Sequence, residues 1–371
     1  MSEKKKTIKI NFCDFYRGFN RENCKVTQLL RRHYTIEFSK TPDFLFYSCF
    51  GNEYQNYQNC VKIFLNNENI LPNFNECDYG QGFDYLDFGE RYFRFSECYL
   101  DKKTADRKCV DESYFNRHFC NFIYSNFNSG EGAKIRQEFC KKLMAYKRVD
   151  CPGAVLNNMK ADDLAPRVDD DWGGNKKKFL KKYKFTIAFE NSRSNGYTTE
   201  KLFDAFESFS VPIYWGNPLV AREFNPKAFI NCNDFDNDFD AVIERIKELD
   251  NDEEKYLSML RENPFQPDFD FKHVEKFHEW IINIIERGNK PFNKDPLDWS
   301  HLPYVYEIKA LKETLNERKY KRKYLKYKIL SKLTFGEQQK QYKEKKKEMK
   351  KRLKEIKAFR NGSRNLSDAE N

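Results

Sequence analysis

The sequence lacks a long apolar run. Its apolar stretches have the length of β-strands, and none approaches the roughly 18 residues that a membrane-spanning helix needs. The first six residues, Met1 to Lys6, also lack the apolar region of a signal peptide. Both absences argue against an integral membrane protein and predict a cytosolic chain.

Residue spacings typical of metal and redox sites are also missing. The 11 cysteines are spread singly with no C-x-x-C pair, which predicts reduced thiols. The five histidines form no H-E-x-x-H or other close spacing, so a structural zinc site has little support. Asp169 to Asp171 contains the D-x-D pattern with which metal-dependent transferases hold a metal diphosphate. Because it lies in a polar, glycine-containing loop (Trp172 to Asn175) ahead of a lysine run, we interpret it as a solvated turn.

Length and pattern favour two domains and an extension. The 371 residues suffice for two domains of ordinary size, and 35 phenylalanines and 22 tyrosines supply material for their cores. Strand and helix patterns alternate through the first 117 residues, and a second such set begins at Phe119. We therefore predict an α/β fold with Rossmann-like domains at residues 1–117 and 118–300.

Residues 183–216 read as strand, polar loop, helix and strand. Residues 185–189 form a short apolar run typical of a buried parallel strand. Thr198 is the expected N-cap of a helix over 199–208, which places Glu200 and Lys201 in its first turn. A helix that begins at the carboxyl edge of a parallel sheet presents free backbone N–H groups, and a lysine beside them favours an anion. The segment predicts a phosphate or diphosphate site; an exposed surface helix with ordinary charges is the alternative.

A second candidate follows the strand predicted at residues 61–65. Glu68 lies in an asparagine-rich loop just past the strand end, where a side chain points into the crevice of an α/β domain. A general base is needed at such a place, although a glutamate in a polar loop is by itself most often a surface residue. Residues 80–95 combine aromatic, acidic and arginine side chains, which suits either a sugar site or, as we favour, a core and its rim.

The pattern FEN-x-x-x-x-G-Y-x-T-E-K followed by V-P-I-Y-W-G resembles the donor-site signature of the family 10 glycosyltransferases. These are the α1,3/4-fucosyltransferases that use GDP-fucose. The likeness extends over roughly residues 5 to 300 and does not securely cover the rest. It implies a GT-B fold, with an acceptor-binding domain at 1–117 and a GDP-fucose-binding domain at 118–300 facing each other across a cleft.

The resemblance also implies roles for individual residues. Glu68 matches the presumed base, although Asn67 stands before it where a glycine is usual. Arg136, in the run R-Q-E-F, matches an arginine that contacts the donor diphosphate; an ordinary surface arginine is the alternative. Lys201 and the helix start would neutralise the departing GDP, and Glu200 would hold fucose hydroxyls and stabilise the oxocarbenium charge. Residues matched near the nucleotide are Asn191 and Tyr197.

The expected function is therefore an inverting α1,3-fucosyltransferase. It would move L-fucose from GDP-β-L-fucose to the GlcNAc 3-hydroxyl of N-acetyllactosamine-type glycans, giving a Lewis x-type product in surface glycan or lipopolysaccharide O-antigen synthesis. The alternatives are a related transferase with another sugar nucleotide or acceptor and, less favoured, a basic nucleic-acid-binding protein. No metal cofactor is required by this scheme, and stimulation by a divalent cation stays open, as does the choice between 3- and 4-hydroxyls.

The C-terminal segment, residues 301–371, differs in composition. Residues 318–360 hold 19 lysines or arginines and 4 glutamates, a net +15 in a chain whose net charge is +10, so the remainder carries −5. Apolar and tyrosine side chains recur there at helical spacing: Tyr320, Tyr324, Tyr327, Met349, Leu353 and Ile356. Such helices suit an anionic membrane surface, which predicts a peripheral enzyme on the cytoplasmic face. Nucleic acid is a rival partner that we do not expect, a solvated extension is the plainer alternative, and homo-oligomerisation stays open.

Overall fold

The computed structural model divides the chain into two compact units. The first, here called the body, contains residues 1–73 and 77–290, and the second, the tail unit, contains residues 74–76 and 291–371. The residues described are 5–94, 102–127, 130–160, 172–292 and 302–367. Within those ranges no helix has both the length and the apolar character needed to cross a membrane.

Within the described residues, six parallel strands form the first sheet of the body, in the order β2-β1-β3-β4-β5-β6. Their bounds are β1 Thr7–Cys13, β2 Thr35–Phe38, β3 Phe44–Tyr47, β4 Val61–Phe64, β5 Tyr79–Gly82 and β6 Tyr92–Arg94. Helix α1 (Lys25–His33) follows β1, and its buried side chains join those of the strands in one apolar core. The stretch predicted at 80–95 supplies most of β5 and all of β6; Phe83 and Tyr92 are buried, whereas Leu86 and Phe88 are exposed, and its sugar-binding alternative stays a prediction.

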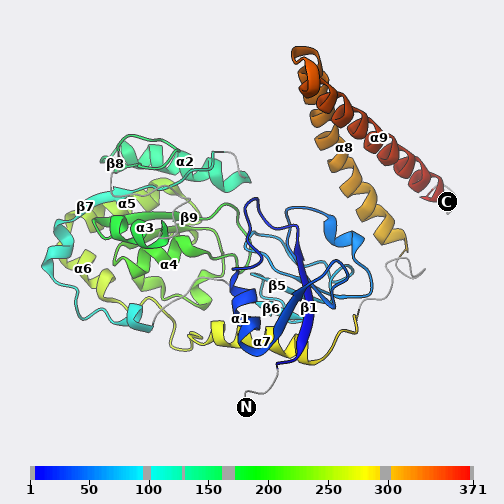
Figure 1. Cartoon of the computed structure of the whole chain (residues 1–371). Helices are drawn as coiled ribbons and strands as arrows, with labels where there is room; N and C mark the ends of the chain where they lie inside the picture. The colour runs from blue at the N-terminus through cyan, green and yellow to red at the C-terminus, as the bar shows by residue number, and fades with distance from the viewer. Residues whose placement is uncertain (1–4, 95–101, 128–129, 161–171, 293–301, 368–371) are drawn as a thin grey trace. The chain divides into compact units, whose positions relative to one another are not determined.

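Helix α7 (His273–Glu286) also belongs to this core, although it follows the second sheet in the chain (Figure 1). Val274, Phe277 and Ile281 pack with apolar residues of β1, β3 and β4. Trp280 Nε1 donates a hydrogen bond to the Glu90 carbonyl at 2.7 Å. The span predicted for the second domain therefore ends in a helix that packs on the first sheet; the other predicted boundaries stay predictions.

The second sheet has five parallel strands among the described residues, in the order β11-β10-β9-β7-β8. Its strands are β7 His118–Asn121, β8 Val149–Asp150, β9 Tyr183–Phe189, β10 Val211–Trp215 and β11 Ile230–Asn231. Its helices are α2 Gly130–Met144, α3 Trp172–Leu180, α4 Glu200–Glu207, α5 Phe239–Asn251 and α6 Glu253–Arg261 (Figure 1). Short 3-10 helices lie in the connections of the body, at Glu53–Asn56, Lys102–Ala105, Glu112–Asn116, Val220–Arg222, Pro226–Ala228 and Cys232–Phe235. Two parallel sheets with covering helices confirm the predicted α/β class.

Strand β9 runs through the middle of the second sheet and is buried along its whole length. Phe185, Ile187 and Phe189 belong to a core shared with α2, α5 and α6, whereas Ala188 belongs to a core shared with α4. A strand covered on both faces reads as a nearly continuous apolar run, which is the pattern that predicted it. The chain leaves this strand at Phe189, at the carboxyl edge of the sheet.

Helix α3 corrects the prediction that residues 172–175 form a polar loop. Gly173 and Gly174 each weaken a helix by about 1 kcal/mol relative to alanine, and this local signal favoured a loop. Tertiary contacts outweigh it, because Phe179 and Leu180 are buried and two lysines pair with α4. The nitrogen–oxygen distances are 2.8 Å for Lys176–Asp204 and 2.7 Å for Lys177–Glu207.

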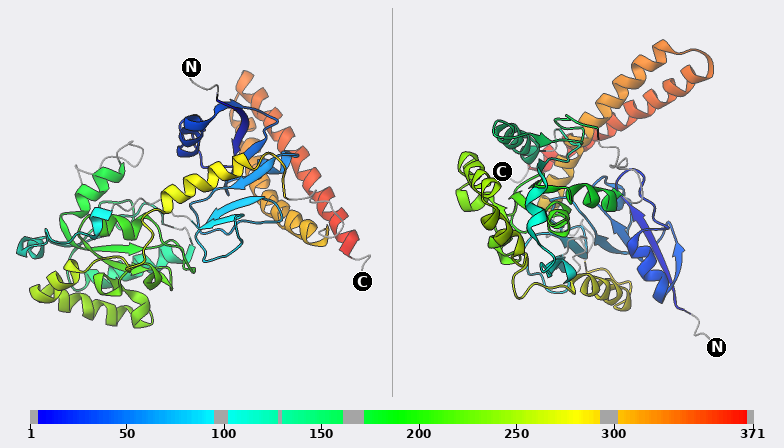
Figure 2. Two further views of the ribbon diagram at one scale, coloured as in Figure 1. Left: turned by 90° about the horizontal axis from the view of Figure 1, so that it is seen from below. Right: turned by 90° about the vertical axis from the view of Figure 1, so that its left-hand side faces the viewer.

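The tail unit contains two long helices that run antiparallel as a hairpin, α8 (Leu302–Leu333) and α9 (Gly336–Ser367) (Figure 2). The rings of Tyr327 in α8 and Tyr342 in α9 stack with centroids 6.1 Å apart. Lys345 Nζ lies about as far from both ring centroids, at 6.0 and 5.9 Å. The predicted helical tail is therefore present as a paired structure rather than as two separate helices.

Two of the six residues in the predicted lipid-facing stripe are buried, and the membrane contact itself stays a prediction. Met349 and Ile356 of α9 are only 8% and 6% exposed, so their apolar surface is not free to meet lipid. A different apolar set is exposed near the turn, where basic residues surround it: Leu325, Ile329, Leu333 and Phe335. Sequence periodicity identifies an apolar face but not the partner that covers it.

Candidate functional site

The carboxyl end of β9 leads into the loop that the sequence singled out. The Glu190 backbone N–H donates to the Trp215 carbonyl at 2.8 Å, which extends the pairing of β9 with β10 by one residue. The loop then runs to Thr199, the N-cap residue of α4. The predicted cap, Thr198, is one residue early: its hydroxyl instead accepts a hydrogen bond from Asn217 Nδ2 at 3.1 Å. Glu200 and Lys201 lie in the first turn, as predicted.

Glu190 is fully buried beneath the start of this helix. Its Oε1 accepts from the Thr199 backbone N–H and its Oε2 from the Thr199 hydroxyl, both at 2.7 Å. Its Oε2 also lies 3.2 Å from Lys201 Nζ. Burial raises the pKa of Glu190, and the charge of Lys201 opposes that rise. The capping group of α4 is therefore a carboxylate from the preceding strand end.

Lys201 is the cation at the centre of the site. Its Nζ donates to Thr199 Oγ1 at 2.8 Å and lies 3.2 Å from carboxylate oxygens of both Glu190 and Glu200. Desolvation acts to lower the pKa of Lys201, yet the two carboxylates hold it well above its usual value. The ammonium group is thus charged and held in place at neutral pH.

Glu200 differs from Glu190 in exposure, because 53% of its side chain is accessible to solvent. Desolvation acts to raise its pKa, but the charges of Lys201 and Lys176 outweigh that effect and lower the pKa to about 2. Glu200 is therefore an ionised and accessible carboxylate, suited to hydrogen bonds with hydroxyl groups or to a cationic centre.

Arg136 in α2 is connected to the same loop. Its Nη1 donates to Asn191 Oδ1 at 2.8 Å and its Nη2 to the Asn126 carbonyl at 2.7 Å. Its guanidinium carbon lies 4.1 Å from the centre of the Tyr124 ring, and burial lowers the pKa of Arg136. The side chain is only 1% exposed, and its Nε has no hydrogen-bond partner among the described residues. Arg136 thus holds Asn191 in place; its contact with a diphosphate stays a prediction.

Two glycines allow the loop to pack this closely. A Cβ atom at Gly132 would lie 2.5 Å from the carbonyl oxygens of both Glu190 and Asn191. Gly196 has φ +92°, and a Cβ there would lie 2.1 Å from the Phe83 carbonyl oxygen. Larger residues at either position would push the loop away from α2 or from the first sheet.

Tyr197 follows Gly196 and is buried against the first sheet. Its ring meets the ring of Phe83 edge to face, with centroids 4.9 Å apart. Burial, together with the negative charges of Glu190 and Glu68, raises the pKa of Tyr197. The phenol is therefore protonated at neutral pH and able to donate a hydrogen bond.

Glu68 is exposed in the loop after β4, and the loop is shaped by asparagines on both sides. Asn66 Oδ1 accepts from the Glu68 backbone N–H at 2.8 Å, and Asn66 Nδ2 donates to the Glu68 carbonyl at 2.6 Å. Asn69 joins this loop to the one after β9: its Nδ2 donates to Ser192 Oγ at 2.7 Å, and its Oδ1 accepts from Ser194 Oγ at 2.6 Å. The structure thus brings the predicted base to the predicted donor loop.

All six predicted residues therefore belong to one connected region. Asn191, Tyr197, Glu200 and Lys201 lie in the loop and helix after β9, Arg136 bonds to that loop, and Asn69 ties the Glu68 loop to it. Sequence analysis missed Glu190 and Asn69 as site residues. Glu190 carries the signal that identified Glu68, a carboxylate just past a buried strand, whereas the partners of Asn69 are more than 120 residues away in sequence.

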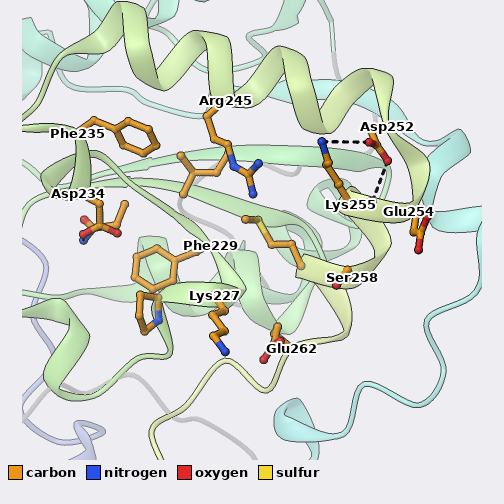
Figure 3. Close-up of a pocket in the computed structure, with 14 residues that line it drawn as sticks. Lys227, Phe229, Asp234, Phe235, Arg245, Asp252, Glu254, Lys255, Ser258 and Glu262 are labelled. Carbon is orange, nitrogen blue, oxygen red and sulfur yellow. Dashed lines mark hydrogen bonds and ion pairs between the residues drawn. The ribbon is translucent and has the colours of Figure 1, made fainter.

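A pocket of about 640 Å³ lies elsewhere in the body and includes none of the predicted site residues (Figure 3). It lies between β11, α5 and α6, and its apolar lining includes Phe229, Phe235 and Met259. Lys255 pairs with Asp252 at 3.5 Å, and charges of both signs surround the opening. Since this lining favours no single ligand chemistry, we place the candidate site at the end of β9.

Metal ligation receives no support from the described part of the chain. No group of three or more histidine, cysteine, aspartate or glutamate side chains there could hold an ion. The D-x-D pattern at 169–171 lies outside the described residues. The ten cysteines in the described ranges are all free thiols.

Comparison with known proteins gives consistent matches along the body. The model of the alpha-(1,3)-fucosyltransferase FucT N-terminal domain matches residues 10–100, and that of the glycosyltransferase family 10 (fucosyltransferase) C-terminal region matches residues 116–280. Alpha-(1,3)-fucosyltransferase FucT of Helicobacter pylori is 34% identical over 305 residues, 68% of this chain and 61% of that protein. The matched part thus spans about three fifths of that relative.

Solved structures agree with this result. A crystal structure of an α1,3-fucosyltransferase has a TM-score of 0.60 and 30% identity, covering 76% of this chain and 92% of that chain. The structure of α1,3-fucosyltransferase with GDP-fucose has a TM-score of 0.61 and 29% identity, covering 80% of this chain and 95% of that chain. The structural likeness confirms the predicted GT-B fold class.

Proposed function

Because this chain belongs to glycosyltransferase family 10, the fucosyltransferases, we propose that it transfers L-fucose from GDP-β-L-fucose to a glycan hydroxyl with inversion at the fucose carbon. The proposed acceptor is the GlcNAc 3-hydroxyl of N-acetyllactosamine-type glycans, in the synthesis of surface glycans or lipopolysaccharide O-antigen. The likeness to an α1,3-fucosyltransferase structure with GDP-fucose supports the donor. The name of the H. pylori relative supports the linkage.

The observation that carries the proposal is the fixed ammonium of Lys201 at the start of α4. A charged lysine beside the first backbone N–H groups of a helix favours a diphosphate, which leaves with more negative charge than it carries in the donor. Glu200 lies next to it with an accessible, ionised carboxylate. Lys201 would thus face the anionic leaving group, and Glu200 would face the positive charge that develops on the sugar carbon.

In the proposed reaction the acceptor hydroxyl oxygen attacks the fucose C1 from the face opposite the diphosphate. The bond from C1 to the phosphate oxygen breaks, and its electron pair leaves with GDP. Glu68 takes the hydroxyl proton as general base, and Glu200 faces the positive charge that develops on the sugar. Asn191 and Tyr197 contact the nucleotide, and the scheme requires no metal ion.

We further propose that the enzyme is peripheral on the cytoplasmic face of a membrane. The net +15 of residues 318–360 supports attraction to anionic lipid, where each lysine or arginine near the surface contributes about 1 kcal/mol. The exposed side chains of Leu325, Ile329, Leu333 and Phe335 supply an apolar surface within this basic segment.

One assay tests the transfer. Purified full-length protein is incubated with GDP-fucose, GDP-mannose, UDP-galactose or UDP-GlcNAc, each with N-acetyllactosamine and with lactose. We expect transfer from GDP-fucose alone and, by NMR of the product, an α-linkage to the GlcNAc 3-hydroxyl. Preferred transfer from another sugar nucleotide would contradict the donor assignment, and a product linked elsewhere would contradict the acceptor assignment alone.

A further inference from the structure

We propose that Glu190 is a positioning residue, which fixes the ammonium group of Lys201 and the first turn of α4 so that both can receive the donor diphosphate. The inference rests on the proposed function, because it concerns how that site holds its leaving group. Glu190 itself is fully buried and acts through Lys201 and Thr199 rather than by touching the substrate.

The hydrogen bonds divide the two carboxylate oxygens between two tasks. Oε1 accepts the backbone N–H of the N-cap residue Thr199, a bond that a glutamate at the third helical position makes in a capping box. Thr199 makes no capping hydrogen bond with its own side chain. Its hydroxyl donates to Glu190 Oε2 and accepts from Lys201 Nζ, so one carboxylate organises both the helix start and the lysine.

The surroundings leave Glu190 no other position. A Cβ atom at Gly216 would lie 2.5 Å from Glu190 Cγ, so the end of β10 closes directly over the side chain. The Glu190 backbone is itself held by the hydrogen bond to Trp215. A carboxylate fixed on both sides fixes the ammonium that is bound to it.

Glu190 and Glu200 make equal contacts with Lys201 but differ in freedom. Both carboxylates lie 3.2 Å from its Nζ, yet the Glu190 side chain has no exposed surface and that of Glu200 is 53% exposed. When Glu200 turns to the sugar and a diphosphate oxygen takes its place, Glu190 keeps Lys201 charged and in position. A buried ammonium group without a fixed anion beside it would either lose its proton or move toward solvent.

The charged and titratable groups around Lys201 predict a pH signature. Desolvation acts to lower the pKa of Lys201, whereas Glu190 and Glu200 raise it, as do Tyr197 in the loop and Tyr124 after β7. The stabilisation gained from the raised pKa is present below the ordinary lysine pKa and is lost as pH rises through the folded value. Removing the Glu190 charge should therefore move the alkaline limb of activity to lower pH.

The test compares wild type with Glu190→Gln, Glu190→Asp and the control Asp250→Asn. Asp250 is a buried carboxylate paired with Lys184, at the opposite end of β9 from the site. Each variant is measured for melting temperature, GDP affinity by calorimetry, and kcat and KM for GDP-fucose from pH 6 to 10.

For Glu190→Gln we expect GDP affinity and kcat/KM to fall about 10- to 100-fold, by analogy with the loss seen when a group that orients a metal ligand is removed. Because the pKa of Lys201 in wild type lies well above its ordinary value, wild-type kcat/KM should stay flat up to pH 10, whereas that of Glu190→Gln should fall on the alkaline side of this range. Glu190→Asp keeps the negative charge but has a shorter side chain, which moves the carboxylate away from Lys201. The alkaline limb of its pH profile should therefore match that of wild type, and its GDP affinity should fall at least about threefold. Asp250→Asn should lower the melting temperature alone.

Wild-type GDP affinity and an unmoved limb in Glu190→Gln would overturn the proposal, as would the same shift in Asp250→Asn. If Glu190→Gln fails to fold, wild-type GDP affinity in Glu190→Asp overturns it instead. The wild-type assay separates this result from the function itself. A wild type that binds GDP but transfers no fucose contradicts the proposed function, and the affinity series still decides the role of Glu190.

Discussion

The two ends of strand β9 each carry a buried lysine–carboxylate pair, with different surroundings. At the amino end, Lys184 pairs with Asp250, whose Oδ2 also lies 2.9 Å from Lys147 Nζ. The Lys184 ammonium lies 4.0 Å from the centre of the Phe115 ring, and both side chains of the pair are at most 5% exposed. At the carboxyl end, Lys201 pairs with buried Glu190 and with half-exposed Glu200.

The two lysines differ in the direction of their pKa shifts. Burial lowers the pKa of Lys184, which shares one aspartate with a second lysine, whereas two carboxylates raise the pKa of Lys201. A buried ion pair alone therefore does not identify a site. The two sites differ in the solvent exposure of the carboxylate. The Glu200 side chain is 53% exposed and is free to turn from Lys201 toward a ligand, whereas the Asp250 side chain is only 1% exposed.

Replacing each lysine in turn should show the largest contrast. Lys201→Met should lower kcat by about 10²- to 10³-fold, because it removes a charge that stabilises the leaving diphosphate. Lys184→Met should leave turnover per folded molecule unchanged and lower the free energy of unfolding by about 3 kcal/mol, since it leaves a buried carboxylate short of a partner. Initial rates and urea unfolding measure the two effects. Equal losses of turnover in both variants would remove the distinction between the two ends.

The carboxyl end also depends on the loop that carries Glu68. Glu68→Gln should keep GDP affinity and lower kcat by about 10²-fold or more, because the amide cannot accept the acceptor proton. Calorimetry with GDP and steady-state kinetics at saturating donor check both halves of this statement. Near-normal turnover would require another base, and the accessible carboxylate of Glu200 is the next candidate.

The sequence predicted the parts of this region that depend on local pattern. The apolar run of β9, the helix after it and the first-turn positions of Glu200 and Lys201 follow from periodicity and strand ends. The role of Glu190 did not follow, because it depends on a side chain that reaches nine residues along the chain to cap α4. The packing of α7 on the first sheet was missed for a similar reason, since only long-range contacts determine it.

A smaller effect should come from the hydrogen bonds that join the two loops. Asn69→Ala should lower kcat about tenfold while GDP affinity stays the same, because the loop that carries Glu68 is no longer held at a fixed position relative to the donor loop. Asn67→Ala, two positions earlier and exposed, is the matched control and should behave like wild type. Steady-state kinetics at saturating GDP-fucose compare the two variants. Equal effects of both substitutions would assign the loss to the loop in general.

Removing residues 291–371 of the tail unit should change catalysis least. A chain ending at Lys290 keeps all six predicted site residues and both sheets, so its kcat on a soluble acceptor should stay within about twofold of wild type. Its binding to anionic vesicles should be lost, and that of the full chain should weaken as salt screens the attraction. Vesicle sedimentation at 50 and 500 mM salt measures this. Equal vesicle binding by both chains contradicts the membrane proposal and leaves the site unaffected.

The claim that the donor diphosphate binds at the carboxyl end of β9 is tested most directly by GDP affinity. Isothermal titration calorimetry of GDP is compared between wild type, Lys201→Met and Lys184→Met, each at a temperature where the protein is folded. We expect Lys201→Met to weaken GDP binding by at least about 30-fold, the loss of a charged hydrogen bond worth about 2 kcal/mol, and Lys184→Met to bind GDP like wild type. Unchanged affinity in Lys201→Met would contradict this placement of the donor site.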